Sequence, residues 1–257
     1  MAGSAPSWRT AGVSVPGVSH LRAGIPCQDA HRCEQLPGGV LVAVVADGAG
    51  SAARAEIGAA CAVSAAVQAT MQRVGDGLPE NDDSWRGLLR SVFQEARAAV
   101  AAEASARGHP VGDLATTLLL AVATPDLLAA GQVGDGAIVA RLAEQHFQTA
   151  TRPPAQEFIN ETTLLTSAHL SGQVQFANLR GRLTGLALFS DGLQLLALQM
   201  PHATPHAPFF DPLLRFVEHT PDRATAEEQL RRFLQSPRLA ERTDDDLTLV
   251  LAARTAG

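Results

Sequence analysis

The sequence VLVAVVADGAGS, residues 40–51, is the part of the chain that decides our interpretation of the fold. A continuous apolar run of strand length ends abruptly at Asp47, and Gly48 and Gly50 follow it. Glycine lacks a Cβ atom, so it lets the backbone turn sharply or come close to a ligand. The pattern predicts a buried strand that ends on a carboxylate beside a small ligand.

Acidic residues also stand at the ends of other strand-like runs. Asp135 lies between two glycines after LLAAGQV, Asp191 follows GLALFS, and the acidic triplet 244–246 precedes LTLVLA. Because the strands of one sheet end close together, we expect these acids to meet at one edge of a sheet. Crowded carboxylates repel each other unless protons or cations neutralise them. Carboxylates and backbone carbonyls suit hard cations such as Mg²⁺ or Mn²⁺, and two such ions can present a shared water as hydroxide to phosphorus. This chemistry predicts a phosphatase.

Composition narrows the protein class. The chain has 257 residues, of which 46% are hydrophobic, and this predicts one large globular domain. The formal net charge of −6 gives no basic surface for nucleic acid. The chain has no uncharged apolar run of about 18 residues and no apolar secretory leader, so we expect a cytoplasmic protein without a membrane span. No two of its three cysteines form a C-x-x-C pair, which argues against a disulfide framework or a structural zinc site.

Apolar spacing predicts the elements around these acids. A turn at residues 36–39 is expected to join the strand before Asp47 to an antiparallel neighbour. Two long helices are expected, over residues 52–74 with Ser51 as N-cap and over residues 85–107. Residues 116–123, 127–133 and 137–142 are predicted to form an antiparallel meander joined by short turns.

The second half of the sequence is less regular. Residues 143–178 are mixed, with TRPPAQEF expected as a surface loop and TTLLT as a short strand. The remaining elements are expected as a strand at 185–190, helices at 192–198, 212–218 and 224–234, and a strand at 247–253. The whole pattern predicts an α+β fold in which helices cover sheets.

Three other site types fit these residues less well. The run from Gly48 to Ala53 matches the dinucleotide-binding fingerprint G-x-G-x-x-A, but the region about 20 residues further on reads as the end of a helix, not as the acidic second strand. A haloacid-type phosphatase needs a second Asp where Ala49 stands. A serine hydrolase triad lacks its G-x-S-x-G turn.

The pieces GVSHLRAGIPCQDA, VADGAGS, ATTLL, VGDGA, SDG and DDDLTLV occur in an order and spacing that resemble one known family. They are similar to the metal-dependent serine/threonine protein phosphatases of type 2C, and most to a compact bacterial branch. The resemblance implies two packed, mainly antiparallel β-sheets flanked by helix pairs. It also implies one phosphatase-like domain over residues 1–257, with a core at about 12–253.

The resemblance implies a role for most of the acids. Asp47 would bridge two Mn²⁺ or Mg²⁺ ions and Gly48 would offer one of them its carbonyl. Asp191 and Asp245 would complete the shell of the first ion. Asp29 stands where the family has a carboxylate that orients metal-bound water.

Further positions add one weaker site and two departures. Asp135 stands where bacterial members bind a third, weaker ion. Gln28 replaces the usual Glu, which removes one negative charge. The Arg that anchors the substrate phosphate in many members has no clear counterpart. His20, three residues after Gly17, stands at the offset of that Arg, and Arg22 is the alternative.

These observations predict a bacterial phosphoprotein phosphatase that hydrolyses phosphoserine and phosphothreonine by attack of a metal-bridging hydroxide, without a covalent phosphoenzyme. Its expected partners are a phosphorylated protein substrate and the Ser/Thr kinase that it opposes, with neither nucleic acid nor membrane. The alternative is an inactive phosphatase-like binding module in a kinase signalling system. The presence of Asp47, Asp191 and Asp245 argues against this alternative. Acids that repel one another without a metal ion would serve no purpose in an inactive protein.

Overall fold

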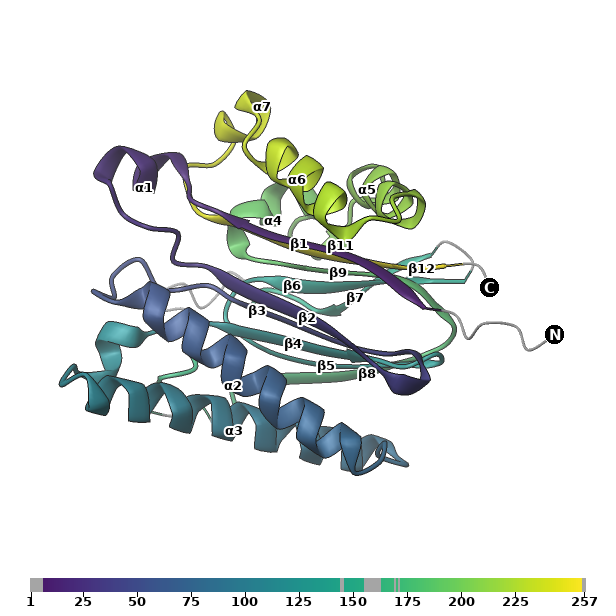
Figure 1. Cartoon of the computed structure of the whole chain (residues 1–257), viewed down its shortest axis with the longest axis horizontal. Coiled ribbons are helices and arrows are strands. Elements are labelled where there is room, and N and C mark those ends of the chain that lie inside the picture. Colours follow the sequence, from purple (N-terminus) through teal and green to yellow (C-terminus); the bar gives the residue numbers. More distant parts are fainter. Residues whose placement is uncertain (1–6, 144–145, 155–162, 169, 171, 256–257) are drawn as a thin grey trace.

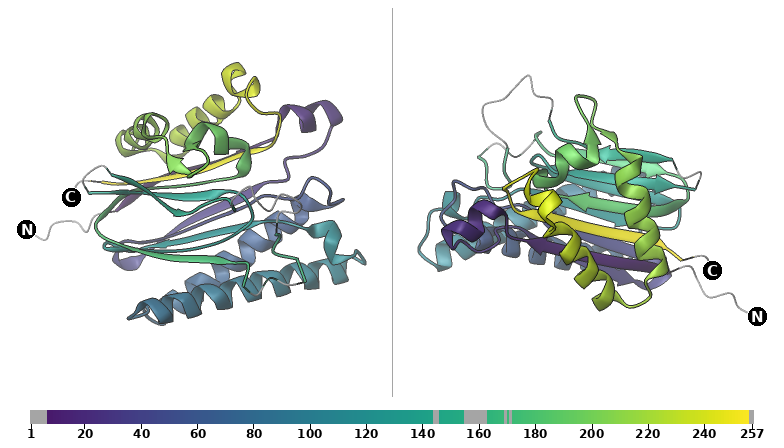
Figure 2. Two further views of the ribbon diagram at one scale, coloured as in Figure 1. Left: turned by 180° about the vertical axis from the view of Figure 1, so that it is seen from behind. Right: turned by 90° about the horizontal axis from the view of Figure 1, so that it is seen from above.

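Two five-stranded antiparallel sheets pack face to face, and helices cover both outer faces (Figure 1). The structure, a computed structural model, describes residues 7–143, 146–154, 163–168, 170 and 172–255. Figure 2 shows the same layers from behind and from above. The predicted α+β sandwich is confirmed.

Each sheet combines strands from distant parts of the sequence. The first sheet has the order β1 (Trp8–Val15), β12 (Leu247–Arg254), β9 (Leu183–Phe189), β6 (Ala137–Leu142) and β7 (Phe147–Thr151). The second sheet has the order β2 (Ala30–Leu36), β3 (Val40–Ala46), β4 (Leu118–Ala123), β5 (Leu127–Val133) and β8 (Gln175–Arg180). A short ribbon pairs β10 (Leu198–Gln199) with β11 (Thr204–Pro205).

Each sheet has its own pair of covering helices. Helices α2 (Ala55–Gly75) and α3 (Asp82–Ala106) pack on the second sheet, and α5 (Ala207–His219) and α6 (Arg223–Leu234) pack on the first. Shorter helices are α1 (Val18–Ala23), α4 (Gln194–Ala197) and α7 (Pro237–Ala240), with 3₁₀ turns at Pro37–Gly39, Val111–Leu114 and Asp191–Leu193.

Strand β3 is apolar throughout because both of its faces are buried. Val42, Val44 and Ala46 face α2 and α3, whereas Leu41 and Val45 face the other sheet. Side chains alternate between faces along a strand, so a strand between two layers needs apolar residues at every position. This burial fixes the place where the chain emerges at Asp47.

The start of α2 differs from the prediction. The helix begins at Ala55 after Arg54, which makes no side-chain cap, so the predicted N-cap at Ser51 is wrong. Residues 49–54 form turns instead, because the Arg54 N–H donates to the Asp113 carbonyl and the Ala52 N–H donates to the Ala49 carbonyl. Helix α3 begins at Asp82, where the Asn81 side chain accepts from the Ser84 N–H.

The predicted three-stranded meander is wrong in its last step. Strand β5 pairs with β4, but β6 belongs to the first sheet and pairs with β9 and β7. The chain crosses between the sheets at Gly134-Asp135-Gly136. Gly134 adopts a φ of 107°, and a Cβ on Gly136 would lie 2.5 Å from the Phe189 carbonyl oxygen, so both positions require glycine.

The described residues of the region 143–178 also differ from the prediction. Residues 163–166 of the predicted TTLLT strand are not in a strand, and Thr162 lies outside the described residues. In TRPPAQEF, Thr151 ends β7, residues 152–154 are loop, and residues 155–158 lie outside the described residues. Strand β8 was not predicted, because its half-buried residues show no clear alternation.

None of the helices within the described ranges is both long and apolar enough to cross a lipid bilayer. The cytoplasmic location stays a prediction, as does the division into a single domain.

Candidate metal centre

Acidic residues from both sheets meet in one pocket of about 480 Å³, which His20 of α1 also lines. Helix α1 lies at one end of the sandwich (Figure 1). Asp47 follows β3 of the second sheet, while Asp191 follows β9 and Asp245 precedes β12 of the first. Asp135 lies at the crossing between the sheets. The acids therefore converge at an end of the sandwich, and not at an edge of a single sheet as expected. The predicted site residues that line this pocket are His20, Asp47, Gly48, Asp135, Asp191 and Asp245.

Two threonines clamp the backbone of Asp47. The Thr117 N–H and the Thr116 hydroxyl both donate to the Asp47 carbonyl, at 2.7 and 2.9 Å, and the Asp47 N–H donates to the Thr117 hydroxyl at 2.9 Å. The Gly48 N–H donates to the Gln28 carbonyl at 3.2 Å. A Cβ on Gly48 would lie 2.7 Å from that oxygen, so only glycine fits. The loop that carries Asp47 is therefore rigidly placed.

The loop of Asp135 is held by a buried amide. The Gln132 Nε2 atom donates to the carbonyls of Gly134 and Gly136, at 3.1 and 2.6 Å. The Gln194 side chain donates to the Asp135 carbonyl at 3.3 Å. These contacts fix Asp135 at the pocket from the side of α4.

Asp29 lies behind the pocket and does not line it. It is 8% exposed, and its Oδ2 atom accepts a 2.8 Å hydrogen bond from the Ser190 hydroxyl. That hydroxyl also accepts from the Thr248 N–H, so Asp29 is tied to the strand ends that carry Asp191 and Asp245. Burial raises the pKa of Asp29 to about 7, and the charge of Asp246 raises it further.

The carboxyl groups of the pocket raise one another's pKa. Loss of hydration raises the pKa of Asp47, and the charges of Asp29 and Asp191 raise it further. Burial, followed by the charge of Asp135, raises the pKa of Asp191 to about 6. Loss of hydration also raises the pKa of Asp245. Within the described part of the chain, these carboxyl groups therefore lack nearby positive charge that would neutralise them.

We tested whether these residues suit a metal ion. No group of three or more His, Cys, Asp or Glu side chains in the described part of the chain is arranged so that it could hold one as it stands. However, the Asp47 and Asp191 carboxyls contact each other, and buried Oδ1 atoms of Asp191 and Asp29 have no hydrogen-bond partner. Carboxylates that crowd together with spare oxygens are expected to spread around a cation once it neutralises them. The donor set, all oxygen, fits Mg²⁺ or Mn²⁺.

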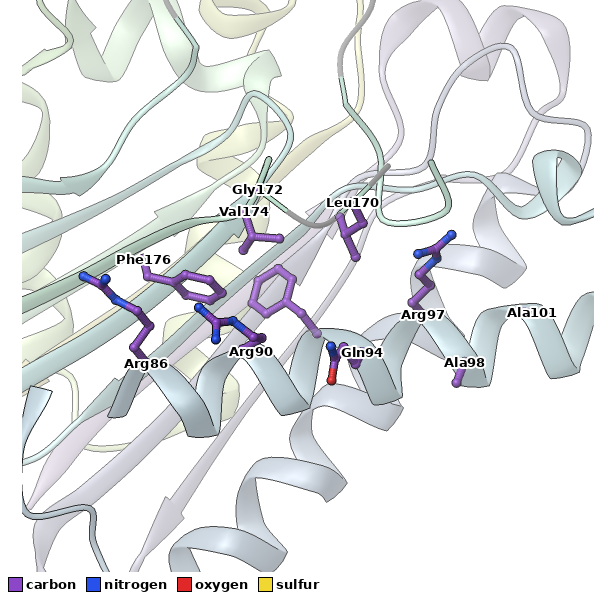
Figure 3. A pocket seen from close by; sticks show the side chains of 11 residues that line it. Arg86, Arg90, Gln94, Arg97, Ala98, Ala101, Leu170, Gly172, Val174 and Phe176 are labelled. Atoms are coloured by element: carbon purple, nitrogen blue, oxygen red, sulfur yellow. The ribbon is translucent and has the colours of Figure 1, made fainter. Parts of the chain in front are cut away.

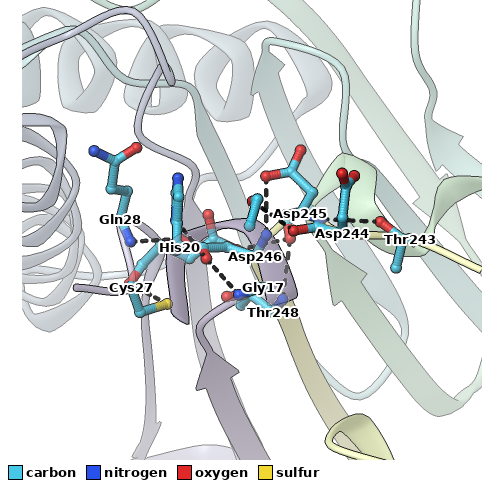
Figure 4. Close-up of polar contacts among 12 residues, drawn as sticks. Gly17, His20, Cys27, Gln28, Thr243, Asp244, Asp245, Asp246 and Thr248 are labelled. Carbon is cyan, nitrogen blue, oxygen red and sulfur yellow. Dashed lines mark hydrogen bonds and ion pairs between the residues drawn. The ribbon is translucent and has the colours of Figure 1, made fainter. Parts of the chain in front are cut away.

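Asp246 is the polar centre of the pocket rim, and the sequence analysis assigned it no role (Figure 4). It is 3% exposed, and its Oδ1 atom accepts from the Gly17 N–H at 2.7 Å and lies 2.8 Å from the His20 Nδ1 atom. Its Oδ2 atom accepts from the Gln28 N–H at 2.6 Å. The acidic triplet did contain a signal for Asp246. Neighbouring residues at the start of a strand point to opposite faces, so the residue next to Asp245 must find polar partners inside the protein.

Hydrogen bonds, and not packing, place α1 and its His20. The helix buries none of its residues, and the Ser19 N–H and hydroxyl both donate to the Asp244 carbonyl. A Cβ on Gly17 would lie 2.3 Å from the backbone of Asp244 and Asp245, so the two segments touch closely. His20 is 16% exposed and reaches the pocket, whereas Arg22 is exposed and does not line it.

The irregular region supplies lining residues that the sequence did not reveal. Leu164 and Ser167 border the pocket, as do Ser51 and Thr117. Gln28 also lines it, and its buried Oε1 atom has no partner. A loop without periodicity gives no sequence signal for such placement, since periodicity is the main signal.

Comparison with known proteins identifies the family of the chain. A family model described as protein phosphatase 2C matches residues 16–235. The serine/threonine-protein phosphatase 3 of Escherichia coli (strain K12) is 37% identical over 260 residues, which cover 96% of this chain and 98% of that protein. The inactive binding module is therefore not favoured.

Solved structures show the same fold at lower identity. The serine/threonine phosphatase Stp1 from Staphylococcus aureus matches with a TM-score of 0.62 at 15% identity, covering 96% of this chain and 95% of that chain. The protein PppA of Pseudomonas aeruginosa matches with a TM-score of 0.61 at 19% identity, covering 96% and 98%. The extent of the family match and the identity to the Escherichia coli enzyme lead to one conclusion. The chain is a serine/threonine protein phosphatase and belongs to the protein phosphatase 2C family.

Proposed function

We propose that the pocket holds two Mg²⁺ or Mn²⁺ ions, with which the chain hydrolyses phosphoserine and phosphothreonine directly with water. The observation that carries this proposal is the convergence of carboxylates from both sheets on one pocket, with spare buried oxygens among them. Asp47, the Gly48 carbonyl, Asp191 and Asp245 would hold the ions. When bound, the ions would supply a water that is acidic enough near neutral pH to attack phosphorus.

The residues of the chain then divide the remaining work. Asp29 would act on the Asp47 carboxyl from behind, because its charge raises the pKa of Asp47 and Ser190 fixes Asp29 in place. His20 would bind an outer oxygen of the substrate phosphate. Of the described residues that line the pocket, it is the one that can carry a positive charge.

The partners follow from the substrate chemistry. Phosphoserine and phosphothreonine arise by phosphoryl transfer to a protein hydroxyl, so we propose that the chain reverses the action of a Ser/Thr kinase. Similarity to the serine/threonine-protein phosphatase 3 of Escherichia coli supports the same class of phosphorylated residue.

Calorimetric titration tests the metal centre itself. We expect the metal-free chain to bind Mn²⁺ at two tight sites and one weaker site. Asp135→Ala should keep both tight sites and lose the weak one, because Asp135 lies at the crossing loop while Asp47 and Asp191 contact each other. Fewer than two tight sites in the parent would contradict the proposal. Loss of a tight site in Asp135→Ala would make Asp135 a ligand of the main pair.

The role of His20 predicts a contrast with Arg22. His20→Ala should raise KM for a phosphopeptide by about tenfold, as expected for loss of a charge-assisted hydrogen bond. Arg22→Ala should change little, because Arg22 is exposed and lies outside the lining of the pocket.

Asp246 supplies the control for this experiment. If Asp246 acts by orienting His20, then Asp246→Asn should raise KM in the parent but add little in the His20→Ala background. Equal effects in both backgrounds would give Asp246 a separate role. The reverse ranking of His20 and Arg22 would transfer phosphate binding to Arg22.

A further inference from the structure

A second pocket, of about 850 Å³, lies between α3 and the segment 170–176 that leads into β8 (Figure 3). We call it the arginine groove and define it by Arg86, Arg90, Arg97, Phe93, Val174 and Phe176. The three arginines come from α3, and Figure 3 shows their side chains on the side of the helix that faces this segment. Residues four apart on a helix share a face, which explains why Arg86 and Arg90 lie together.

The positive charge of the groove is not neutralised within the described part of the protein. Arg86 and Arg90 are exposed, and neither makes an ion pair or hydrogen bond with a described residue. Arg97 is half-buried and donates to the Ala168 carbonyl at 3.5 Å. Elsewhere on this helical layer Arg73 pairs with Glu95 and Arg107 pairs with Glu103. None of the described residues that line the groove is acidic, although the chain carries a formal net charge of −6.

The floor of the groove is apolar. The Phe93 and Phe176 rings pack edge to face, with centroids 6.0 Å apart and an interplanar angle of 84°. Phe93 is 1% exposed, while Val174 and Phe176 are half-buried and form the accessible part of the floor. A cationic rim over an apolar floor is complementary to an extended segment in which acidic side chains accompany apolar ones.

Residues that line the metal pocket and residues that line the arginine groove follow one another in the sequence. Leu164 and Ser167 line the metal pocket, while Leu170 and Gly172 line the groove. Leu165, which lies between Leu164 and Ser167, is fully buried, and its N–H donates to the Thr116 carbonyl at 2.8 Å, next to the clamp on Asp47. The metal pocket and the groove are therefore lined by neighbouring parts of one segment of the chain.

We propose that the arginine groove binds acidic residues that flank the phosphorylated serine or threonine of the substrate. The enzyme then prefers phosphosites in acidic surroundings. This proposal rests on the proposed function for the place of the phosphate and on the groove for the selection of the sequence.

The test compares substrates that differ only in flanking charge. Two phosphoserine peptides of equal length carry Glu or Gln at the same flanking positions, on either side of the phosphoserine in separate pairs. An aryl phosphate serves as the substrate without flanks. We expect the parent to favour one Glu peptide by about tenfold in kcat/KM, which equals about 1.4 kcal/mol and suits two or three exposed charge pairs.

Substitutions locate the preference. Arg86→Gln with Arg90→Gln should reduce the preference to near unity and leave turnover of the aryl phosphate unchanged, because Gln keeps the helix propensity while removing the charge. The matched control is Arg215→Gln with Arg238→Gln, which removes two exposed arginines from α5 and α7 and should keep the preference. Raising the ionic strength from 0.05 to 0.5 M should shrink the preference in the parent, since salt screens exposed charges, with a Debye length of about 10 Å at 0.1 M.

Binding of a labelled Glu phosphopeptide, followed by fluorescence anisotropy, separates the two proposals. Equal kcat/KM for Glu and Gln peptides in an enzyme that hydrolyses the aryl phosphate would overturn the role of the groove and leave the proposed function standing. If the variant with Arg86→Gln and Arg90→Gln still prefers the Glu peptide, the role of the groove is likewise overturned and the proposed function stands. Binding that depends on Arg86 and Arg90 in a chain without metal-dependent turnover would instead support the groove and contradict the proposed function.

Discussion

Replacement of Asp47 by asparagine is expected to lower turnover of a phosphopeptide by about a hundredfold or more while the chain stays folded. Outer-shell partners of metal ligands typically contribute 10- to 100-fold to affinity or activity, so the residue proposed to lie between both ions should exceed that range. Excess chelator should abolish turnover of the parent, and added Mn²⁺ should restore it, because the ions would supply the attacking water. Initial rates on an aryl phosphate and on a phosphoserine peptide measure both effects.

Asp244→Asn is the matched control. Asp244 also lies beside the pocket and is exposed, but it uses its backbone carbonyl, which the substitution keeps, to bind Ser19. The variant removes one negative charge near the pocket and should keep turnover within about twofold, because surface substitutions usually have small effects. Full activity of the parent in excess chelator would contradict a metal mechanism, and an equal loss in Asp244→Asn would reduce the Asp47 effect to one of net charge.

The metal-free protein is expected to lose stability as the pH rises from about 5 to 8. The folded-state pKa of Asp29 is raised to about 7 and that of Asp191 to about 6, and that of Asp47 is raised as well. A carboxyl group with a raised folded-state pKa binds more protons in the folded than in the unfolded chain between its two pKa values, so the free energy of unfolding falls as the pH rises through that window. We expect Tm in chelator to fall by roughly 5 °C or more.

Two comparisons isolate the cluster from other titrating groups. Mn²⁺ at pH 8 should raise Tm again, because an ion bound to the folded state alone stabilises it. Asp47→Asn in chelator should melt at or above the parent at pH 8 and show a smaller fall with pH. His31, whose pKa burial lowers, changes stability in the opposite direction, but it is present in both proteins and cancels in the difference. A large loss of stability in metal-free Asp47→Asn would mark Asp47 as structural.

The sequence predicted the acids of the pocket because each one interrupts an apolar run. Asp47 and Asp191 follow strands that are buried on both faces, and such strands stand out by composition alone. The direction that the chain takes after a turn was harder to predict from the sequence. Gly134 and Gly136 permit a tight turn within one sheet and an equally short crossing to the other, and only packing of β6 against β9 decides between them.

Contacts between distant segments could not be predicted for a related reason. Asp246 binds Gly17, His20 and Gln28, which are more than 200 residues away in sequence, and neither segment shows a pattern that indicates the other. Leu164 and Ser167 reach the pocket from a stretch without periodicity. The missed parts of the site are thus the parts that depend on tertiary proximity alone.

The pairing of β1 with β12 has a consequence for synthesis. These strands pair along their full length, from Trp8 opposite Arg254 to Val15 opposite Leu247, and they bring α1 beside Asp245 and Asp246. A ribosome makes about 5–20 residues per second, so β1 waits on the order of ten seconds or more for its partner strand. During that time the second sheet with α2 and α3 can form, but the pocket lacks one of its walls. A nascent chain that stops before β12 therefore cannot acquire the complete centre, and the cell obtains no phosphatase activity until the last strand has been made.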